Sequence, residues 1–123
     1  MTYLLTILQL LVAGGLINVW VLRFNKGTNY RGKSAKNMRE EFAAYGLPGW
    51  FMWLVGALKL TSAAALLFGI WQPEVVFPSA VVLVVLMTGA ITMHLRTRDP
   101  FVKFVPALIM LLLSVIIAIL SLP

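Results

Sequence analysis

The sequence predicts an all-α fold, an integral membrane four-helix bundle with a short amphipathic interfacial helix between its first and second spans. Its 123 residues are 61% hydrophobic and only 11% charged, against about 25% charged residues in a typical soluble domain. Four apolar runs are long enough to cross a bilayer, which takes about twenty helical residues. Nine of the ten Lys and Arg residues lie in two hydrophilic connections, and the tenth, Lys59, lies in the middle of an apolar run.

Composition also excludes several classes of protein. The chain has no cysteine, so disulfides, thiol catalysis and cysteine-bound metal clusters are ruled out. The net charge of +6 is confined to short connections, a pattern that suits anionic lipid head groups rather than nucleic acid. We therefore expect one membrane domain, residues 1–123, that binds no nucleic acid.

The first span is predicted over residues 2–22. It lacks the basic start and the small-residue cleavage site of a signal peptide, so we expect a retained helix. Tyr3 and Trp20 would mark its two interfaces with water. Its polar side chains, Gln9 and Asn18, are expected to form hydrogen bonds between helices.

The connection 23–49 holds six basic residues and a predicted amphipathic helix. Ser34 would be its N-cap and Gly46 its left-handed stop. Such a helix usually lies in the membrane interface, or it could fold over the mouth of the bundle as a lid. Its apolar face is formed by three residues at helical spacing: Met38, Phe42 and Tyr45.

The remaining three spans are predicted over residues 50–71, 76–95 and 101–122. A tight turn around Pro73 makes the second and third spans antiparallel neighbours. Asp99 followed by Pro100 is a good N-cap and first residue for the fourth span.

The distribution of positive charge predicts the orientation. Connections 23–49 and 96–103 carry six and three basic residues, whereas the other ends of the spans carry none. The positive-inside rule then places both connections in the cytoplasm and both termini outside. We expect a bacterial inner membrane as the location.

Lys59 is the candidate centre of a binding site, because a cation near the middle of a span costs about 2.5–3.5 kcal/mol. The alternative is a lysine that is merely tolerated by snorkelling. The polar side chains expected near it are Asn18, Thr88, Thr92 and His94. No carboxylate occurs within a span, so the candidate counter-charges are Glu40, Glu41 and Asp99. His94 has no second histidine beside it, so we expect no metal site.

Three blocks of the sequence resemble the DoxX-like family of small membrane proteins. These are MHLRTRDPFVKFVPAL at 93–108, EFAAYGLP at 41–48 and VGALK at 55–59, and the resemblance extends over about residues 39–120. The same broad group includes the assembly chaperone of nicotinic acetylcholine receptors, which the chain resembles more distantly. The resemblance implies a four-helix membrane bundle. Many members carry an acidic residue where Lys59 stands, so this site should prefer an anionic or electron-rich group.

Two functions are compatible with these features. The first is a binding or assembly subunit that holds a lipophilic ligand or a partner helix near Lys59. The alternative is a quinone-associated subunit of an oxidoreductase complex, with the quinone near Lys59, Asn18 and His94; a transporter is less well supported. We expect no intrinsic cofactor and no enzyme activity by the chain alone, because no nucleophile–base pair is visible. The expected partners are membrane lipids and either a membrane protein or a second copy.

Overall fold

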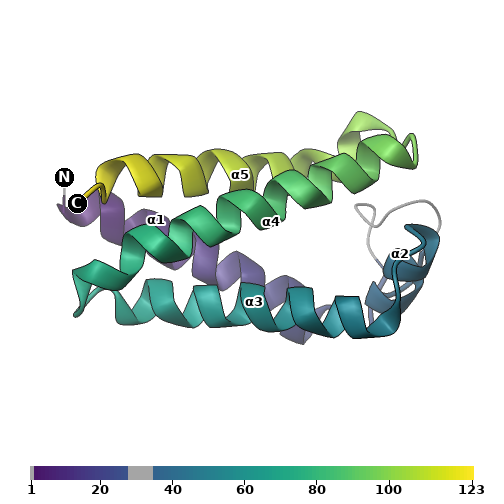
Figure 1. The fold of residues 1–123 in the computed structure, drawn as a ribbon, viewed down its shortest axis with the longest axis horizontal. Helices are drawn as coiled ribbons and strands as arrows, with labels where there is room; N and C mark the ends of the chain where they lie inside the picture. Colours follow the sequence, from purple (N-terminus) through teal and green to yellow (C-terminus); the bar gives the residue numbers. More distant parts are fainter. Residues whose placement is uncertain (1, 28–34) are drawn as a thin grey trace.

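Four long helices dominate the structure, a computed structural model that describes residues 2–27 and 35–123 (Figure 1). The described residues contain no strand. In chain order the elements are α1 (Thr2–Ile17), the π-helical η1 (Asn18–Leu22), α2 (Met38–Ala44), α3 (Gly49–Phe68), the 3₁₀-helical η2 (Pro73–Val75), α4 (Val76–Arg96) and α5 (Phe101–Leu120).

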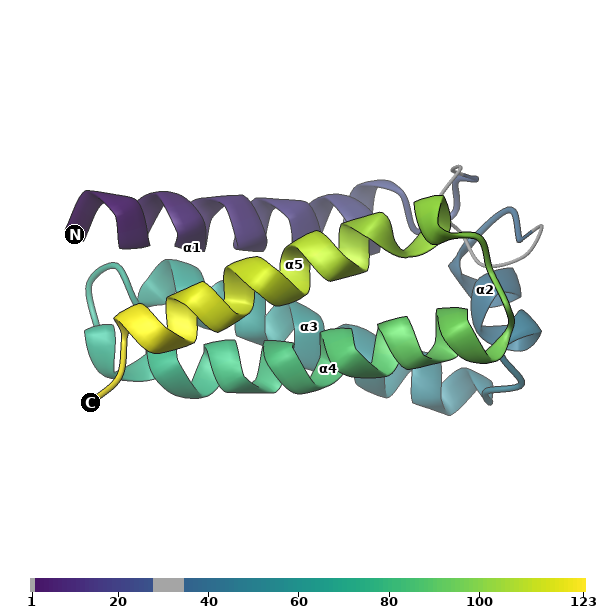
Figure 2. The same ribbon diagram turned by 90° about the horizontal axis from the view of Figure 1, so that it is seen from above.

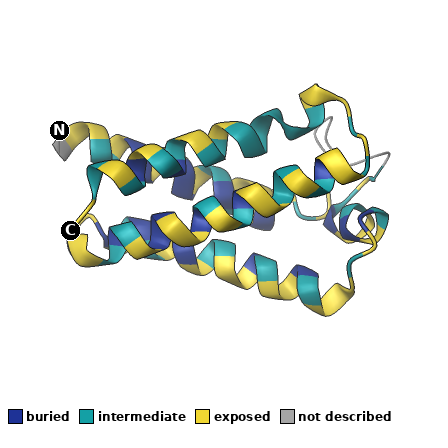
Figure 3. Cartoon of the chain, turned by 45° about the horizontal axis from the view of Figure 1, so that its top comes forward, coloured by how far each residue is buried: buried dark blue, intermediate teal, exposed yellow. Residues whose placement is uncertain are grey.

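Within the described part of the chain, four stretches of helix are long and apolar enough to cross a membrane: Tyr3–Leu22, Gly49–Phe68, Pro73–Arg96 and Phe101–Leu120. The predicted all-helical fold with four membrane spans is therefore confirmed. The second span ends three residues earlier than expected, because the chain turns after Phe68. In Figure 3 the exposed residues follow the outer faces of the long helices. Many exposed residues are large and apolar, as a lipid-facing surface requires.

Each long helix packs against two neighbours, in the cyclic order α1, α3, α4, α5. Both termini and the turn between α3 and α4 lie at one end of the molecule (Figures 1 and 2). The short helix α2 and the turn between α4 and α5 lie at the other end. This second end is called the α2 end below. The described parts of both basic connections thus lie at the same end.

Two groups of buried residues hold the helices together. The larger one, the central core, contains Leu8, Val12, Ala13, Leu16, Ala63, Leu66, Val76, Ala80, Leu83, Met87 and Ile117. The smaller one, the α2-side cluster, contains Trp20, Met38, Phe42 and Met52. Every long helix except α5 thus contributes more than one residue to the central core.

Gln9 links α1 to the end of α3. Its side chain is buried, and its Nε2 donates to the Leu66 carbonyl at 2.7 Å. That carbonyl belongs to the last turn of α3, where acceptors lack a partner within the helix. The interhelical hydrogen bond expected of Gln9 is confirmed. Asn18, in contrast, is exposed, and its side chain makes no hydrogen bond to the described residues.

The short helix α2 begins at Met38, four residues after the expected N-cap Ser34, which lies outside the described residues. The N-cap is Asn37, whose Oδ1 accepts from the backbone N–H of Glu40 at 2.9 Å. The Glu40 carboxylate in turn accepts from the backbone N–H of Lys36 at 3.0 Å. This reciprocal pattern is a variant of the capping box, and it fixes the start of the helix.

The predicted stop of α2 is confirmed. Gly46 has a φ of +76°, and its N–H donates to Ala43 O while the N–H of Leu47 donates to Phe42 O, both at 3.0 Å. These two bonds define a Schellman motif. The apolar face of α2 is buried, and Met38 and Phe42 pack with Trp20 of η1 and Met52 of α3. That face therefore contacts protein, and the choice between an interfacial helix and a lid stays a prediction.

Candidate functional site

Lys59 lies over the indole ring of Trp20. Its Nζ is 5.5 Å from the ring centroid, within the range of a cation–π interaction. The lysine is half-buried on α3. Among the described residues, its ammonium makes no hydrogen bond and no ion pair. The partner inside the chain is thus an aromatic face, which stabilises the charge but accepts no conventional hydrogen bond.

Gly56 explains why the Trp20 ring can reach this position. A Cβ at Gly56 would lie 2.6 Å from Cζ3 of Trp20, so the ring occupies the space that a side chain would fill. Gly56 and Lys59 are three residues apart and share one face of α3. Trp20 belongs to the π-helical segment η1, and its side chain is buried. The i to i+5 hydrogen bonding of this segment includes the bond from the N–H of Arg23 to Asn18 O, at 2.9 Å.

Trp20 was predicted only as an interface marker, so its contact with Lys59 was missed. The signal in the sequence was a glycine one turn before the lysine. The ring also meets Phe42 of α2 edge-on, with centroids 5.9 Å apart. Glu41 is also on α2, whereas Lys59 is on α3. The Glu41 carboxylate attracts the Lys59 ammonium through space, without an ion-pair contact between the two. A role for Glu41 as counter-charge stays a prediction.

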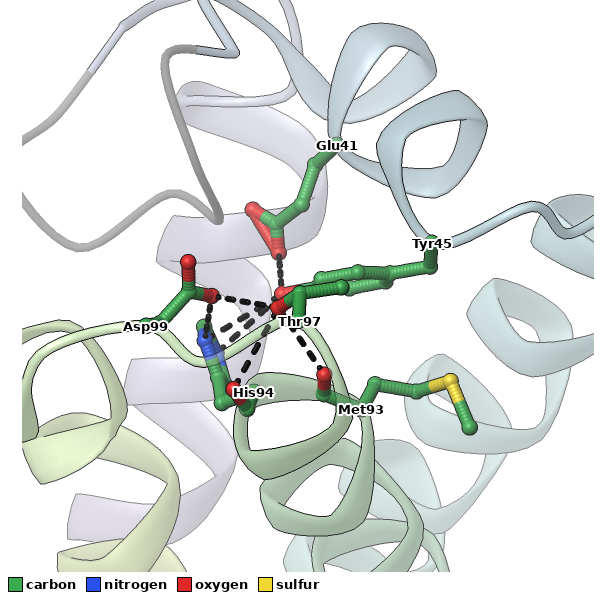
Figure 4. A network of polar contacts seen from close by, with 6 residues as sticks. All are labelled: Glu41, Tyr45, Met93, His94, Thr97 and Asp99. Atoms are coloured by element: carbon green, nitrogen blue, oxygen red, sulfur yellow. Dashed lines mark hydrogen bonds and ion pairs between the residues drawn. The ribbon is translucent and has the colours of Figure 1, made fainter.

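A second polar group, the His94 cluster, lies at the α2 end and consists of Glu41, Tyr45, His94, Thr97 and Asp99 (Figure 4). His94 Nδ1 is 2.8 Å from Asp99 Oδ2, and the two side chains are only 6% and 3% exposed. Tyr45 Oη lies 3.3 Å from each ring nitrogen of His94 and donates to Glu41 Oε2 at 3.3 Å. The cluster thereby joins α2 to the end of α4.

The turn after α4 places Asp99 on His94. The N–H of Arg98 donates to Leu95 O at 3.1 Å, and the N–H of Asp99 donates to His94 O at 2.9 Å. This is a second Schellman motif, with Arg98 in the left-handed position at a φ of 58°. The contact that normally joins two apolar side chains across this motif is here the polar pair His94–Asp99.

The expectation that Asp99 caps the fourth span is wrong. The N-cap of α5 is Pro100, and it forms no side-chain cap hydrogen bond. The Asp99 carboxylate instead accepts from His94 and from the Thr97 hydroxyl, the latter at 3.1 Å. The ring of Phe104, with its centroid 6.1 Å from that of His94, packs beside the pair.

The other predicted site residues lie apart from both groups. The hydroxyls of Thr88 and Thr92 donate to carbonyls of their own helix, Val84 O at 2.7 Å and Thr88 O at 2.8 Å. Both threonines are exposed, on the side of α4 opposite the buried residues Leu83 and Met87. Asn18 is exposed, and Glu40 is engaged in the cap of α2.

The structure therefore brings the predicted residues together in two places. Lys59 meets Trp20, while His94 meets Asp99, and Glu41 acts on both groups. Tyr45 is the second residue that sequence reasoning missed as a polar partner, because it completes an apolar face. Its spacing from Glu41, four residues along a helix, was the available signal.

Comparisons with known proteins agree with the membrane fold. The profile of a family described as the DoxX-like family matches residues 4–117. An uncharacterized protein of Bacillus subtilis (strain 168), YdgD, is 35% identical over 79 residues, which cover 63% of this chain and 69% of the relative. No solved structure matches the chain significantly.

Proposed function

The chain belongs to the DoxX-like family, and from that premise we propose that it holds a lipophilic ligand or a partner helix at Lys59, as a binding or assembly protein of the membrane. The resemblance to this family is confirmed, and the chain is an integral membrane protein. The more distant link to the acetylcholine receptor chaperone stays a prediction. The observation that carries the proposal is the Lys59 ammonium on the Trp20 ring, without a hydrogen-bond acceptor among the described residues.

The chemistry of Lys59 defines the class of ligand. An ammonium carries three N–H donors and no acceptor. Trp20 stabilises its positive charge and leaves those donors unused, and Glu41 acts only at a distance. In an apolar span, an incoming carboxylate, phosphate or carbonyl oxygen would gain a charge-assisted hydrogen bond. An anionic or electron-rich group on a lipophilic body, or on a partner helix, fits these requirements.

We also propose that the four helices form a bundle in a bacterial inner membrane, with the α2 end in the cytoplasm. The described parts of the two basic connections lie at this end (Figure 1). Together the two connections carry nine basic residues, which supports the positive-inside assignment. The outer side of α2 suits a place at the interface. There the guanidinium of Arg39 lies 5.2 Å from the ring centroid of Trp53, which is 54% exposed.

The alternatives have less support. The comparisons with known proteins give no support to a quinone-associated subunit. No contact described above favours a transporter over a binding protein. The His94–Asp99 pair already uses Nδ1 of the histidine, so His94 offers a quinone at most one ring nitrogen. The binding role at Lys59 is the function that the geometry supports best.

The test compares Lys59→Met with the wild type, with Lys59→Arg and with Lys36→Met as a matched control at an exposed lysine. Each form is purified in mild detergent, and co-purifying lipids, small molecules and proteins are identified by mass spectrometry. Losing a charge-assisted hydrogen bond of about 1.5–3 kcal/mol should weaken retention about ten- to a hundredfold in Lys59→Met. Lys59→Arg should keep part of the ligand, and Lys36→Met all of it.

Melting curves recorded on the same samples separate binding from folding. Lys59→Met removes a partly desolvated cation and keeps the volume, so its melting temperature should be unchanged or higher. An unchanged set of co-purifying molecules in a folded Lys59→Met protein would contradict the proposal.

A further inference from the structure

We propose that Arg39, held on the rings of Phe24 and Trp53, binds the phosphate of an anionic phospholipid at the α2 end of the bundle. The guanidinium carbon of Arg39 lies 5.2 Å from the ring centroid of Trp53 and 5.9 Å from that of Phe24. The two rings are stacked, with their centroids 5.5 Å apart. This site does not include Lys59, and it does not rest on the binding role proposed for that lysine.

Three parts of the chain build the site. Arg39 is on α2, Trp53 is on α3, and Phe24 follows η1. A hydrogen bond from the N–H of Met38 to Phe24 O, at 2.9 Å, joins the start of α2 to the segment after η1. The ring of Phe24 also packs against Trp20, with centroids 6.1 Å apart. The guanidinium of Arg39 therefore lies on rings whose places are fixed by the packing of the bundle.

The two rings hold the guanidinium and leave its donors unused. A guanidinium has five N–H donors in a planar fork, whereas an aromatic face attracts its charge without a conventional hydrogen bond. Among the described residues, the Arg39 side chain makes no hydrogen bond and no ion pair. The carboxylate of Glu40, its neighbour in sequence, accepts from the Lys36 backbone and the Asn37 amide instead. Because the fork matches the oxygens of a phosphate, the site is preorganised to bind one.

The backbone around Arg39 is rich in positive charge. The segments 23–27 and 35–44 lie close together, since a Cβ at Gly27 would be 3.4 Å from Lys36 O. These two segments carry four basic residues and two acidic ones. A net positive charge beside the membrane attracts anionic head groups, and the stacked guanidinium then supplies a defined place for one phosphate.

Trp53 places the site at the level of the lipid head groups. It lies in the second turn of α3, about 6 Å along the helix from Gly49 at about 1.5 Å per residue. Its ring is 54% exposed, as is usual for tryptophans at the membrane interface. Leu54 and Leu58 continue the exposed apolar surface toward the middle of the span. A phospholipid satisfies both the cation and this apolar surface, whereas a free phosphate satisfies only the cation.

The test measures the binding of defined lipids to the whole chain in mild detergent. Delipidated protein is titrated with phosphatidylglycerol or with phosphatidylcholine of the same acyl chains, and native mass spectrometry counts the bound lipids. The wild type should bind phosphatidylglycerol about fivefold more tightly, because the choline group offsets the charge of its phosphate. A molar excess of inorganic phosphate should not displace the lipid. Displacement, or equal binding of the two lipids, would overturn the proposal.

Variants locate the binding at Arg39. Arg39→Gln should bind phosphatidylglycerol about tenfold more weakly, because it loses a charge-assisted hydrogen bond. Arg39→Lys should be intermediate, since it keeps the charge without the planar fork. The matched control is Arg96→Gln, which removes the same charge from an exposed residue at the end of α4. Arg96 lies on no aromatic ring among the described residues, so this control should bind as the wild type does.

Equal binding by the wild type and a folded Arg39→Gln would overturn the proposal, and melting curves establish that each form is folded. An equal loss in Arg96→Gln would also overturn it, because net charge alone would then explain the binding. Binding that is lost in Lys59→Met and kept in Arg39→Gln would assign the lipid to Lys59 instead. If Arg39→Gln does not fold, Arg39→Lys and the preference of the wild type between the two lipids decide.

Discussion

Arg98 and Gly46 occupy the same position in two Schellman motifs, yet only one of them is a glycine. Both have a positive φ, 58° and 76°. A residue with a Cβ pays about 1–2 kcal/mol for this left-handed conformation, whereas glycine adopts it freely. Arg98 is therefore a point of backbone strain in the turn that places Asp99 against His94.

Arg98→Gly should relieve this strain and raise the free energy of unfolding by about 0.5–1 kcal/mol, after the greater freedom of glycine in the unfolded chain is included. Gly46→Ala should do the reverse. Both are measured as shifts in melting temperature in one detergent. A lower melting temperature for Arg98→Gly would show that the arginine side chain stabilises the turn by more than its backbone costs.

For single residues, the sequence predicted which side chains belong to a polar site more accurately than it predicted what those side chains contact. Asp99 before Pro100 satisfies the sequence pattern of an N-cap. In the structure, Asp99 instead follows the left-handed residue Arg98 in the turn after α4, where its carboxylate contacts His94. Lys59 was evident as a lone cation in a span, whereas its contact with Trp20 depends on the packing of two helices at Gly56. Contacts of this kind arise from tertiary structure and leave only weak signals in the chain.

Among the helices, α2 shows how an element can be predicted and its start misplaced. Ser34 and Asn37 are both good N-cap residues. The capping-box spacing from Asn37 to Glu40 distinguishes them, and the structure follows it. The end of α2 was predictable because Gly46 has a backbone conformation that few other residues adopt. The long helices were predictable from their length and apolar composition alone.

The junction of α1 and α3 supplies a prediction about a whole element. Gln9→Leu removes the donor to the Leu66 carbonyl and leaves that buried acceptor unpaired. We expect a loss of about 1 kcal/mol in the free energy of unfolding, near the upper values measured for hydrogen bonds between membrane helices. Unfolding of the purified protein in a denaturing detergent measures the difference.

Gln9→Glu is the matched variant for this junction, because it keeps the shape of the side chain but replaces the donating amide. It should be at least as unstable as Gln9→Leu. Equal stability of Gln9→Leu and the wild type would show that the last turn of α3 finds another donor, such as water, at no cost.

For the whole molecule, the orientation in the membrane is open to a simple chemical test, since the chain has no cysteine of its own. Single cysteines can be introduced at Ala43 on α2 and at Gln72 in the turn between α3 and α4, because both residues are exposed. Helix α2 and this turn lie at opposite ends of the molecule (Figure 1). In intact cells, an impermeant thiol reagent should label Gln72→Cys and spare Ala43→Cys. Permeabilised cells should show labelling of both.

The reverse pattern would overturn the orientation proposed from the nine basic residues. The charge distribution predicts which connections share a side, and the described parts of both connections lie at one end of the molecule. The charge and packing of the chain do not identify the ligand of Lys59, because an ammonium group selects a class of hydrogen-bond acceptors and not one molecule.

The position of α5 has a consequence for how the protein is made. It is the least buried of the four long helices, and Ile117 is its one residue in the central core. Chains are synthesised from the N-terminus, so α5 leaves the ribosome after α1, α3 and α4. By then Lys59, Trp20 and the entire His94 cluster have already been translated, and Phe104 of α5 is a later residue that packs beside His94. The order of synthesis thus delivers both polar groups before the ring of Phe104 that packs beside His94.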